Sequence, residues 1–139
     1  MKILIYDDNI DDIKQIESCI TCFFNKINEE YIIKYCQTQE ELFSLIKNYD
    51  MLFLDIELSN ENGIEIGLKI REIKTDCIII ITTHYKKYAI DGYKIEADRY
   101  FIKPINQSEF NIEMDYIIRK YHRNLIGFHD IKLSKNKIY

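Results

Sequence analysis

Short apolar runs alternate with amphipathic segments along the whole chain. Each apolar run is bounded by polar residues, which is the pattern of a strand buried in a sheet. One run is almost entirely β-branched, which is typical of a central strand covered on both faces. The predicted strands are Lys2–Tyr6, Tyr31–Gln37, Asp50–Ile56, Cys77–Ile81 and Arg99–Ile102.

Between these strands, apolar residues recur at spacings of three and four, which predicts amphipathic helices. The clearest such stripe runs from Ile10 to Ile27. Thr38 followed by Glu41 has the form of a capping box and predicts a helix start. Further helices are predicted from Gly63 onward, around Tyr88–Tyr93, and from a cap at Asn106 through an apolar face that ends at Tyr121.

Five successive strand–helix units predict an α/β fold with a parallel sheet and helices on both faces. With five strands and five helices, the flavodoxin-like, doubly wound strand order 2-1-3-4-5 is favoured. In this order, ligands bind at the carboxyl ends of strands one and three, where the strand order reverses. We therefore expect the functional residues directly after those strands.

The 139 residues suit one compact domain, and their formal net charge of -4 is unevenly distributed. Residues 119–139 hold six Lys or Arg and one Asp, a net charge of +5, which leaves -9 for the first 118 residues. The acidic body argues against direct nucleic-acid binding by the main domain. The basic end predicts a solvated linker or the approach to a DNA-binding domain.

No apolar run approaches the roughly 20 residues that a bilayer-spanning helix needs, and the amino terminus lacks the form of a secretory signal. We therefore expect a cytoplasmic protein without membrane contact, whose four cysteines are thiols. Cys19 and Cys22 form a C-x-x-C motif inside the first predicted helix. Because no second ligand pair lies nearby in sequence, a structural role is favoured over redox or metal chemistry.

Carboxylates end both strands at the predicted binding edge. Asp7 and Asp8 follow the first strand, and Asp55 lies at the end of the third. Like charges this close repel and raise one another's pKa. A hard divalent cation with oxygen ligands removes this conflict, and a few carboxylates completed by water suit Mg²⁺. The pattern therefore predicts a magnesium site in preference to three unrelated strand-end aspartates.

Two further groups are predicted at the same edge. The fourth strand leads into Thr82 and Thr83, which supply hydroxyl groups. The fifth strand leads into Lys103, a point charge suited to phosphate oxygens, and into Pro104, the only proline. A lone X–Pro bond beside a charge cluster predicts a cis peptide that fixes the aim of Lys103.

Taken in order, these residues resemble the receiver domain of bacterial two-component response regulators. The resemblance covers residues 2 to about 122 and includes L-D-I-E-L around Asp55, Gly63 eight residues later, and Tyr100-x-x-Lys103-Pro104. It implies a receiver domain over residues 1–122 and a basic linker over residues 123–139.

The resemblance implies a role in phosphoryl transfer for three side chains. Asp55 is the implied phosphoacceptor, Lys103 contacts a phosphoryl oxygen, and Tyr100 is an aromatic rotamer switch. Phosphoryl transfer needs mainly positioning and charge neutralisation, which suits these groups. Because no glycine-rich phosphate loop is visible, the expected donor is a phosphohistidine on a sensor histidine kinase. The protein is then no turnover enzyme, and catalyses only its own phosphotransfer and dephosphorylation.

The same resemblance implies a set of magnesium ligands. Asp8 and Asp55 bind the ion directly, with the backbone carbonyl of Glu57 as a third protein ligand. Asp7 acts mainly through water.

The hydroxyl that bonds the phosphoryl group has two candidates. The family usually has a small residue after its Thr or Ser, which favours Thr82. Counting from Arg71 favours Thr83 instead and would place the bulky His84 beside the phosphoryl site. Ser59, where many relatives carry proline, is a further departure with little expected effect on the chemistry.

Other segments resemble regulators that carry a LytTR-type DNA-binding domain. These are L-D-I-E-L-S-x-x-x-G-I, Tyr88-Ala89 and Ala97-Asp98-Arg99-Tyr100, and Asp130–Tyr139 is similar to the linker and first strand of that domain. This implies control of transcription, with DNA contact only through an output domain absent from this chain. The family resemblance also implies a partner or homodimer surface on the fourth helix, fifth strand and fifth helix.

Two other functions fit parts of the pattern. L-F-L-D-I-E-L is similar to the nucleophile strand of haloacid-dehalogenase-like phosphatases, but that family prefers Asp where Glu57 stands and places this strand first. The other alternative is a receiver that docks partners without phosphorylation. Such receivers usually lose the acidic pair or the lysine, and both are present here.

Overall fold

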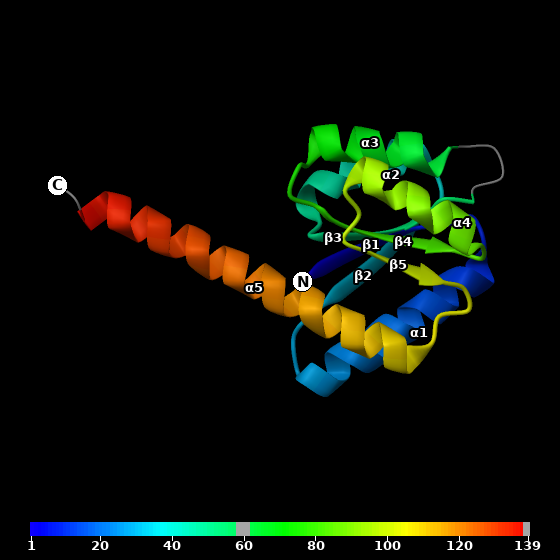
Figure 1. Cartoon of the computed structure of the whole chain (residues 1–139), viewed down its shortest axis with the longest axis horizontal. Helices are drawn as coiled ribbons and strands as arrows, with labels where there is room; N and C mark the ends of the chain where they lie inside the picture. The colour runs from blue at the N-terminus through cyan, green and yellow to red at the C-terminus, as the bar shows by residue number, and fades with distance from the viewer. Residues whose placement is uncertain (58–61, 138–139) are drawn as a thin grey trace.

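Five strands and five α-helices alternate along the chain, as Figure 1 shows. The computed structural model describes residues 1–57 and 62–137, with side-chain surroundings up to Ile126. In chain order, the elements are β1 Lys2–Tyr6, α1 Ile10–Ile27, β2 Ile32–Cys36, α2 Gln39–Leu45, β3 Met51–Asp55, α3 Gly63–Ile73, β4 Ile78–Thr83, α4 Lys86–Ala89, β5 Arg99–Ile102 and α5 Gln107–Lys137. Two 3-10 segments, η1 Ile46–Asn48 and η2 Ile90–Ile95, follow α2 and α4.

All strand pairs are parallel, and the strand order is β2-β1-β3-β4-β5. This confirms the flavodoxin-like order expected from the sequence. The strand order reverses between β1 and β3, where ligands of such sheets bind. In the register of the sheet, Tyr6 pairs with Leu54 and Asp55 pairs with Thr82. The residues that follow β1, β3 and β4 therefore emerge at one edge.

The helices form one layer on each face of the sheet (Figure 1). α1 and α5 cover one face, and α2, α3 and α4 cover the other. Successive strand residues point to opposite faces, so the strands contribute to two buried clusters. The α1–α5 core contains Phe53 and Phe101, and the α2–α3 core contains Leu54 and Ile81.

Side-chain caps start the helices that surround the site. Asn9 Oδ1 accepts from the Asp12 N–H at 3.0 Å at the start of α1. The predicted cap of α2 is confirmed, because Thr38 Oγ1 accepts from the Glu41 N–H at 3.3 Å. Asn62 caps α3, whereas Ser59 and the rest of the predicted polar loop before it, residues 58–61, lie outside the described residues. These caps satisfy backbone N–H groups that a helix start leaves open.

The predicted helix around Tyr88–Tyr93 is short and irregular. α4 has one α-helical turn and continues as the 3-10 segment η2. Gly92, in η2, lies so close to β4 that an added Cβ would stand 2.6 Å from Ile81 Cδ1. Glu96 then ends the segment in the left-handed conformation, with φ 53°. The chain thus packs closely on β4 at a glycine and turns directly into β5.

α5 is longer than the apolar periodicity predicted. The helix continues through Lys137, so residues 123–137 are helical where the sequence pointed to a linker and a first strand. Phe110, Met114 and Ile117 are buried against the sheet, whereas Leu125 and Ile126 are exposed. The apolar stripe in the sequence therefore marks only the part of α5 that packs against the sheet, because hydrophobic periodicity reflects packing and not helix length. The division into a receiver over residues 1–122 and a basic segment after it stays a prediction.

None of the described helices is both long and apolar enough to cross a membrane.

Candidate functional site

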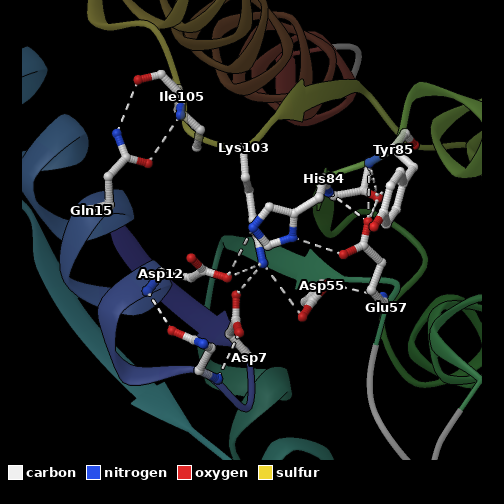
Figure 2. A network of polar contacts seen from close by, with 11 residues as sticks. Asp7, Asp12, Gln15, Asp55, Glu57, His84, Tyr85, Lys103 and Ile105 are labelled. Carbon is white, nitrogen blue, oxygen red and sulfur yellow. Dashed lines mark hydrogen bonds and ion pairs between the residues drawn. The ribbon is translucent and has the colours of Figure 1, made fainter.

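The predicted site residues meet at the carboxyl edge of the sheet (Figure 2). Asp7 follows β1, Asp55 ends β3, and Lys103 follows β5. Side chains alternate between the two faces of a sheet along each strand. Asp7, Asp55 and Lys103 therefore lie on the same face as the strand residues of the α1–α5 core. The parallel sheet therefore brings together side chains that lie far apart in the sequence.

Three carboxylates form a compact oxygen-rich group. Asp7, Asp8 and Asp55 each place an oxygen within 4.8 Å of the others. Asp7 and Asp55 are buried, and Asp8 is exposed. Burial raises the pKa of Asp55 to about 6, against the lowering effect of the Glu57 N–H, which donates to it at 2.9 Å, and of Lys103. A hard cation would offset this accumulated negative charge, so these residues fit Mg²⁺.

The Lys103 ammonium is surrounded by carboxylates. Its Nζ lies 2.8 Å from Asp7 Oδ2, 3.0 Å from Asp12 Oδ2 and 3.5 Å from Asp55 Oδ2. Burial alone would lower the pKa of Lys103, but the hydrogen bond to Asp7 and the charges of Asp55 and Asp7 outweigh it and raise the pKa. The peptide bond between Lys103 and Pro104 is cis, as the sequence predicted.

Gln15 ties the loop after β5 to α1 (Figure 2). Its Nε2 donates to the Ile105 carbonyl at 3.0 Å, and its Oε1 accepts from the Ile105 N–H at 3.1 Å. The sequence pattern singled out neither Gln15 nor Asp12, because polar residues near a helix start are usually solvated. We refer to Asp7, Asp12, Gln15, Lys103 and Ile105 as the α1 side of the site.

On the opposite flank, Glu57 gathers donors from the end of β4. Its carboxylate accepts from the Thr83 hydroxyl and from the backbone N–H groups of His84 at 2.5 Å and Tyr85 at 3.1 Å. His84 Nδ1 lies 2.9 Å from Glu57 Oε2. Burial alone would raise the pKa of Glu57, but the hydrogen bonds from Thr83 and His84 outweigh it and lower the pKa. We refer to Glu57, Thr83, His84 and Tyr85 as the α4 side.

The side chain of Glu57 is a part of the site that the sequence analysis missed, since only its backbone carbonyl was expected to take part. The available signal was an acidic residue two positions after Asp55 together with a histidine directly after the strand-end hydroxyls.

The two candidate hydroxyls lie on opposite faces of β4. Strand alternation points Thr82 toward the α1–α5 core and Thr83 toward the α2–α3 core. The Thr82 hydroxyl is buried and has no hydrogen-bond partner among the described residues, whereas the Thr83 hydroxyl bonds Glu57. Tyr100 points to the same face as Thr83, because its neighbour Phe101 belongs to the α1–α5 core. The Tyr100 side chain is exposed.

Fold and site together define the class of this protein. The chain matches the response regulator receiver domain over residues 3–115, most of its length. It belongs to this family and is a receiver domain of two-component signalling, which works through phosphorylation.

The relatives that the chain resembles are transcriptional and sensory regulators. It is 42% identical over 84 residues to the transcriptional regulatory protein LytR of Staphylococcus aureus (strain N315). This match covers 60% of this chain and 32% of LytR. It is 26% identical over 125 residues to the sensory transduction protein LytT of Bacillus subtilis (strain 168), which covers 88% of this chain and 48% of LytT. The predicted resemblance to this group is confirmed, and the chain spans about half the length of these relatives.

Solved structures of receiver domains have the same fold. The receiver domain of AraT from Geobacillus stearothermophilus superposes with a TM-score of 0.75 at 23% identity, over 89% of this chain and 97% of that one. A two-component response regulator from Clostridium difficile gives a TM-score of 0.72 at 27% identity, over 87% of this chain and 98% of that one.

Proposed function

We propose that Asp55 accepts a phosphoryl group from a phosphohistidine of a sensor histidine kinase, with Mg²⁺ as the cofactor. The observation that carries this proposal is the position of the Asp55 carboxylate. It lies within 4.8 Å of two other carboxylates and 3.5 Å from Lys103 Nζ. A nucleophile between a cation site and a lysine can attack a phosphoryl group whose charge both neutralise.

In the proposed transfer, an Asp55 oxygen forms a bond to phosphorus while the N–P bond of the donor breaks. The imidazole nitrogen leaves with the bonding electron pair, and the product is an acyl phosphate. Bound Mg²⁺ would supply charge neutralisation at the phosphoryl oxygens. Asp8, Asp55 and the Glu57 carbonyl would hold the ion directly, with Asp7 acting through water, while Lys103 would bond another phosphoryl oxygen.

We propose Thr83 as the switch hydroxyl, although the sequence favoured Thr82. Thr83 shares a strand face with Tyr100, so its movement toward the phosphoryl group would vacate space for the tyrosine ring. Its hydroxyl bonds Glu57, and on phosphorylation of Asp55 it would exchange this partner for a phosphoryl oxygen. Thr83→Ala should abolish the change in the Tyr100 ring resonances on phosphorylation, whereas Thr82→Val should preserve it.

We further propose that the chain acts in the cytoplasm as the receiver part of a transcription regulator. The names of the relatives support a transcriptional output, with DNA contact through a LytTR-type domain beyond these residues. All four cysteines are free thiols, as a reducing compartment requires. Exposed Tyr88, Tyr93 and Tyr100 support a homodimer contact through α4, β5 and α5.

The test is incubation of the protein with Mg²⁺ and acetyl phosphate or phosphoramidate, followed by mass spectrometry. We expect one acid-stable, base-labile phosphoryl group on Asp55 that is absent with EDTA and in Asp55→Asn. A folded, Mg²⁺-replete protein that takes up no phosphoryl group would overturn the proposal in favour of a phosphorylation-independent docking receiver. Repeated hydrolysis of a chromogenic phosphate ester would instead indicate a phosphatase.

A further inference from the structure

Asp12 is a charged contact of the site that the roles assigned above do not use. It lies in the first turn of α1, where the Asn9 side chain caps its backbone N–H at 3.0 Å. Its Oδ2 lies 3.0 Å from Lys103 Nζ and 3.8 Å from His84 Nε2. Figure 2 shows Asp12 beside the ammonium, across from Asp55. Asp12 therefore acts on the group that is expected to bind the phosphoryl oxygen.

The contacts of Lys103 leave no proton free for a new partner. An ammonium group has three N–H donors. Two of them bond Asp7 at 2.8 Å and Asp12 at 3.0 Å, and the third faces Asp55 at 3.5 Å. A phosphoryl oxygen on Asp55 could take over the third donor only weakly unless the ammonium moved toward it. Such a movement must lengthen one of the two short contacts.

The three carboxylates differ in how easily they can release Lys103. The side chain of Asp7 is 0% exposed and that of Asp55 is 4% exposed, so bulk water has almost no access to replace the ammonium there. The side chain of Asp12 is 21% exposed. A carboxylate that loses a cation is tolerated only where water or another donor takes its place. Asp12 is therefore the contact that can open at the lowest cost.

We propose that Asp12 is a positioning residue that holds the Lys103 ammonium on the α1 side and competes with the phosphoryl oxygen for it. The inference rests on the proposed function, since it assumes that Lys103 binds a phosphoryl group on Asp55. Asp12 stabilises the unphosphorylated arrangement, in which Lys103 pairs with it, and has no such effect once Lys103 has moved. Its carboxylate also repels the phosphoryl oxygens, which acts in the same direction.

If Asp12 competes with the phosphoryl oxygen for Lys103, removing the Asp12 carboxylate should increase the affinity of the protein for a phosphoryl mimic. We would titrate beryllofluoride into the protein at saturating Mg²⁺ and follow binding by ¹⁹F NMR and calorimetry, with Mg²⁺ affinity measured separately. Asp12→Asn should bind beryllofluoride about five- to tenfold more tightly, the equivalent of one partly exposed charge-assisted hydrogen bond. Asp12→Ser, too short to reach the ammonium, should act in the same direction if Asp12→Asn does not fold. Asp12→Glu should restore affinity close to that of the wild type.

The matched control is Asp11→Asn, which removes the same charge from the same helical turn. Asp11 is exposed, so its loss should change the affinity less than about twofold. Equal or weaker binding in both folded Asp12 variants, with a wild type that does bind, would overturn the inference and leave the proposed function intact. A wild type that binds no beryllofluoride with Mg²⁺ would overturn the proposed function and the inference with it. A gain in Asp11→Asn as large as in Asp12→Asn would show a general charge effect and would also overturn the inference.

Discussion

The two sides of the site are built in opposite ways. On the α1 side, the contacts join buried or half-buried groups: Lys103 pairs with the buried Asp7, and the half-buried Gln15 bonds both backbone groups of Ile105. On the α4 side, donors from consecutive residues converge on the single carboxylate of Glu57, and the His84 side chain is 47% exposed. The first arrangement connects parts of the chain about 90 residues apart, and the second connects Glu57 to the end of β4 and the two residues that follow it.

This difference indicates that the two sides of the site have different roles. Breaking a buried ion pair leaves an uncompensated charge and is costly, whereas exposed polar contacts exchange readily for water. We therefore expect the α1 side to hold the charge that receives the phosphoryl group. The α4 side, next to the short and irregular α4, is expected to rearrange when the charge on Asp55 changes.

Loss of the α1-side cation should have the largest effect. Lys103→Met is expected to slow labelling by acetyl phosphate about 100-fold, because one preorganised charge is lost where charge develops. It should also lower the free energy of unfolding by about 3 kcal/mol, since Asp7 keeps a buried charge without its partner. Labelling rates and urea denaturation measure both effects. Lys94→Met, which removes an exposed lysine whose ion-pair partner among the described residues is Asp91, is the control and should change neither quantity appreciably.

Asp55, whose carboxylate lies between the two sides of the site, should make the free energy of unfolding depend on pH. Its pKa is raised to about 6 in the folded protein, above the unfolded value, so the folded state binds the proton more tightly. The stability that this proton provides is present below about pH 4 and is lost as the pH rises through about 6. Asp55→Asn should therefore be more stable than the wild type by about 2 kcal/mol near pH 7.5 with EDTA. Urea titrations should show this gain disappear toward pH 4, and a gain that persists there would contradict the assignment. Asp11→Asn, at an exposed position, should show no such gain.

Removing the hydrogen bonds between Gln15 of α1 and Ile105 in the loop after β5 should lower stability by an intermediate amount. Gln15→Leu removes two hydrogen bonds to Ile105 and should lower the free energy of unfolding by about 1 to 2 kcal/mol. Hydrogen exchange of the Ile105 amide, which would lose its acceptor, should accelerate at the same time. Gln37→Leu, at an exposed position directly after β2, serves as the control. An unchanged Ile105 amide would mean that the loop is held by other contacts.

The α4 side should tolerate substitution best. His84 lies between Glu57, 2.9 Å from its Nδ1, and Asp12, 3.8 Å from its Nε2. Because the ring is half exposed, His84→Ala should change the free energy of unfolding by less than about 0.5 kcal/mol. Labelling of Asp55 by acetyl phosphate should become severalfold faster, because the ring that lies between Glu57 and Asp12 beside the site is removed. A loss of stability as large as that of Gln15→Leu would contradict the proposed difference between the two sides.

The residues that were predictable from sequence are those attached directly to strand ends. Asp7, Asp55 and Lys103 follow apolar runs, and a parallel sheet places all such ends at one edge. Asp12 and Gln15 were not predictable in the same way. Their partners lie about 90 residues away in the chain, and a helical position alone does not say which loop packs against it.

By itself, the sequence determined the alternation of strands and helices, the strand order and the set of strand-end residues, because each depends on local periodicity and on the rules of parallel sheets. The tertiary structure alone decided which hydroxyl faces Tyr100, which carboxylates surround Lys103, and that Glu57 accepts from the end of β4. It also decided how far α5 extends beyond the sheet. These features depend on distances between side chains of different elements, and such distances follow from the packing of the whole domain rather than from any pattern along the chain.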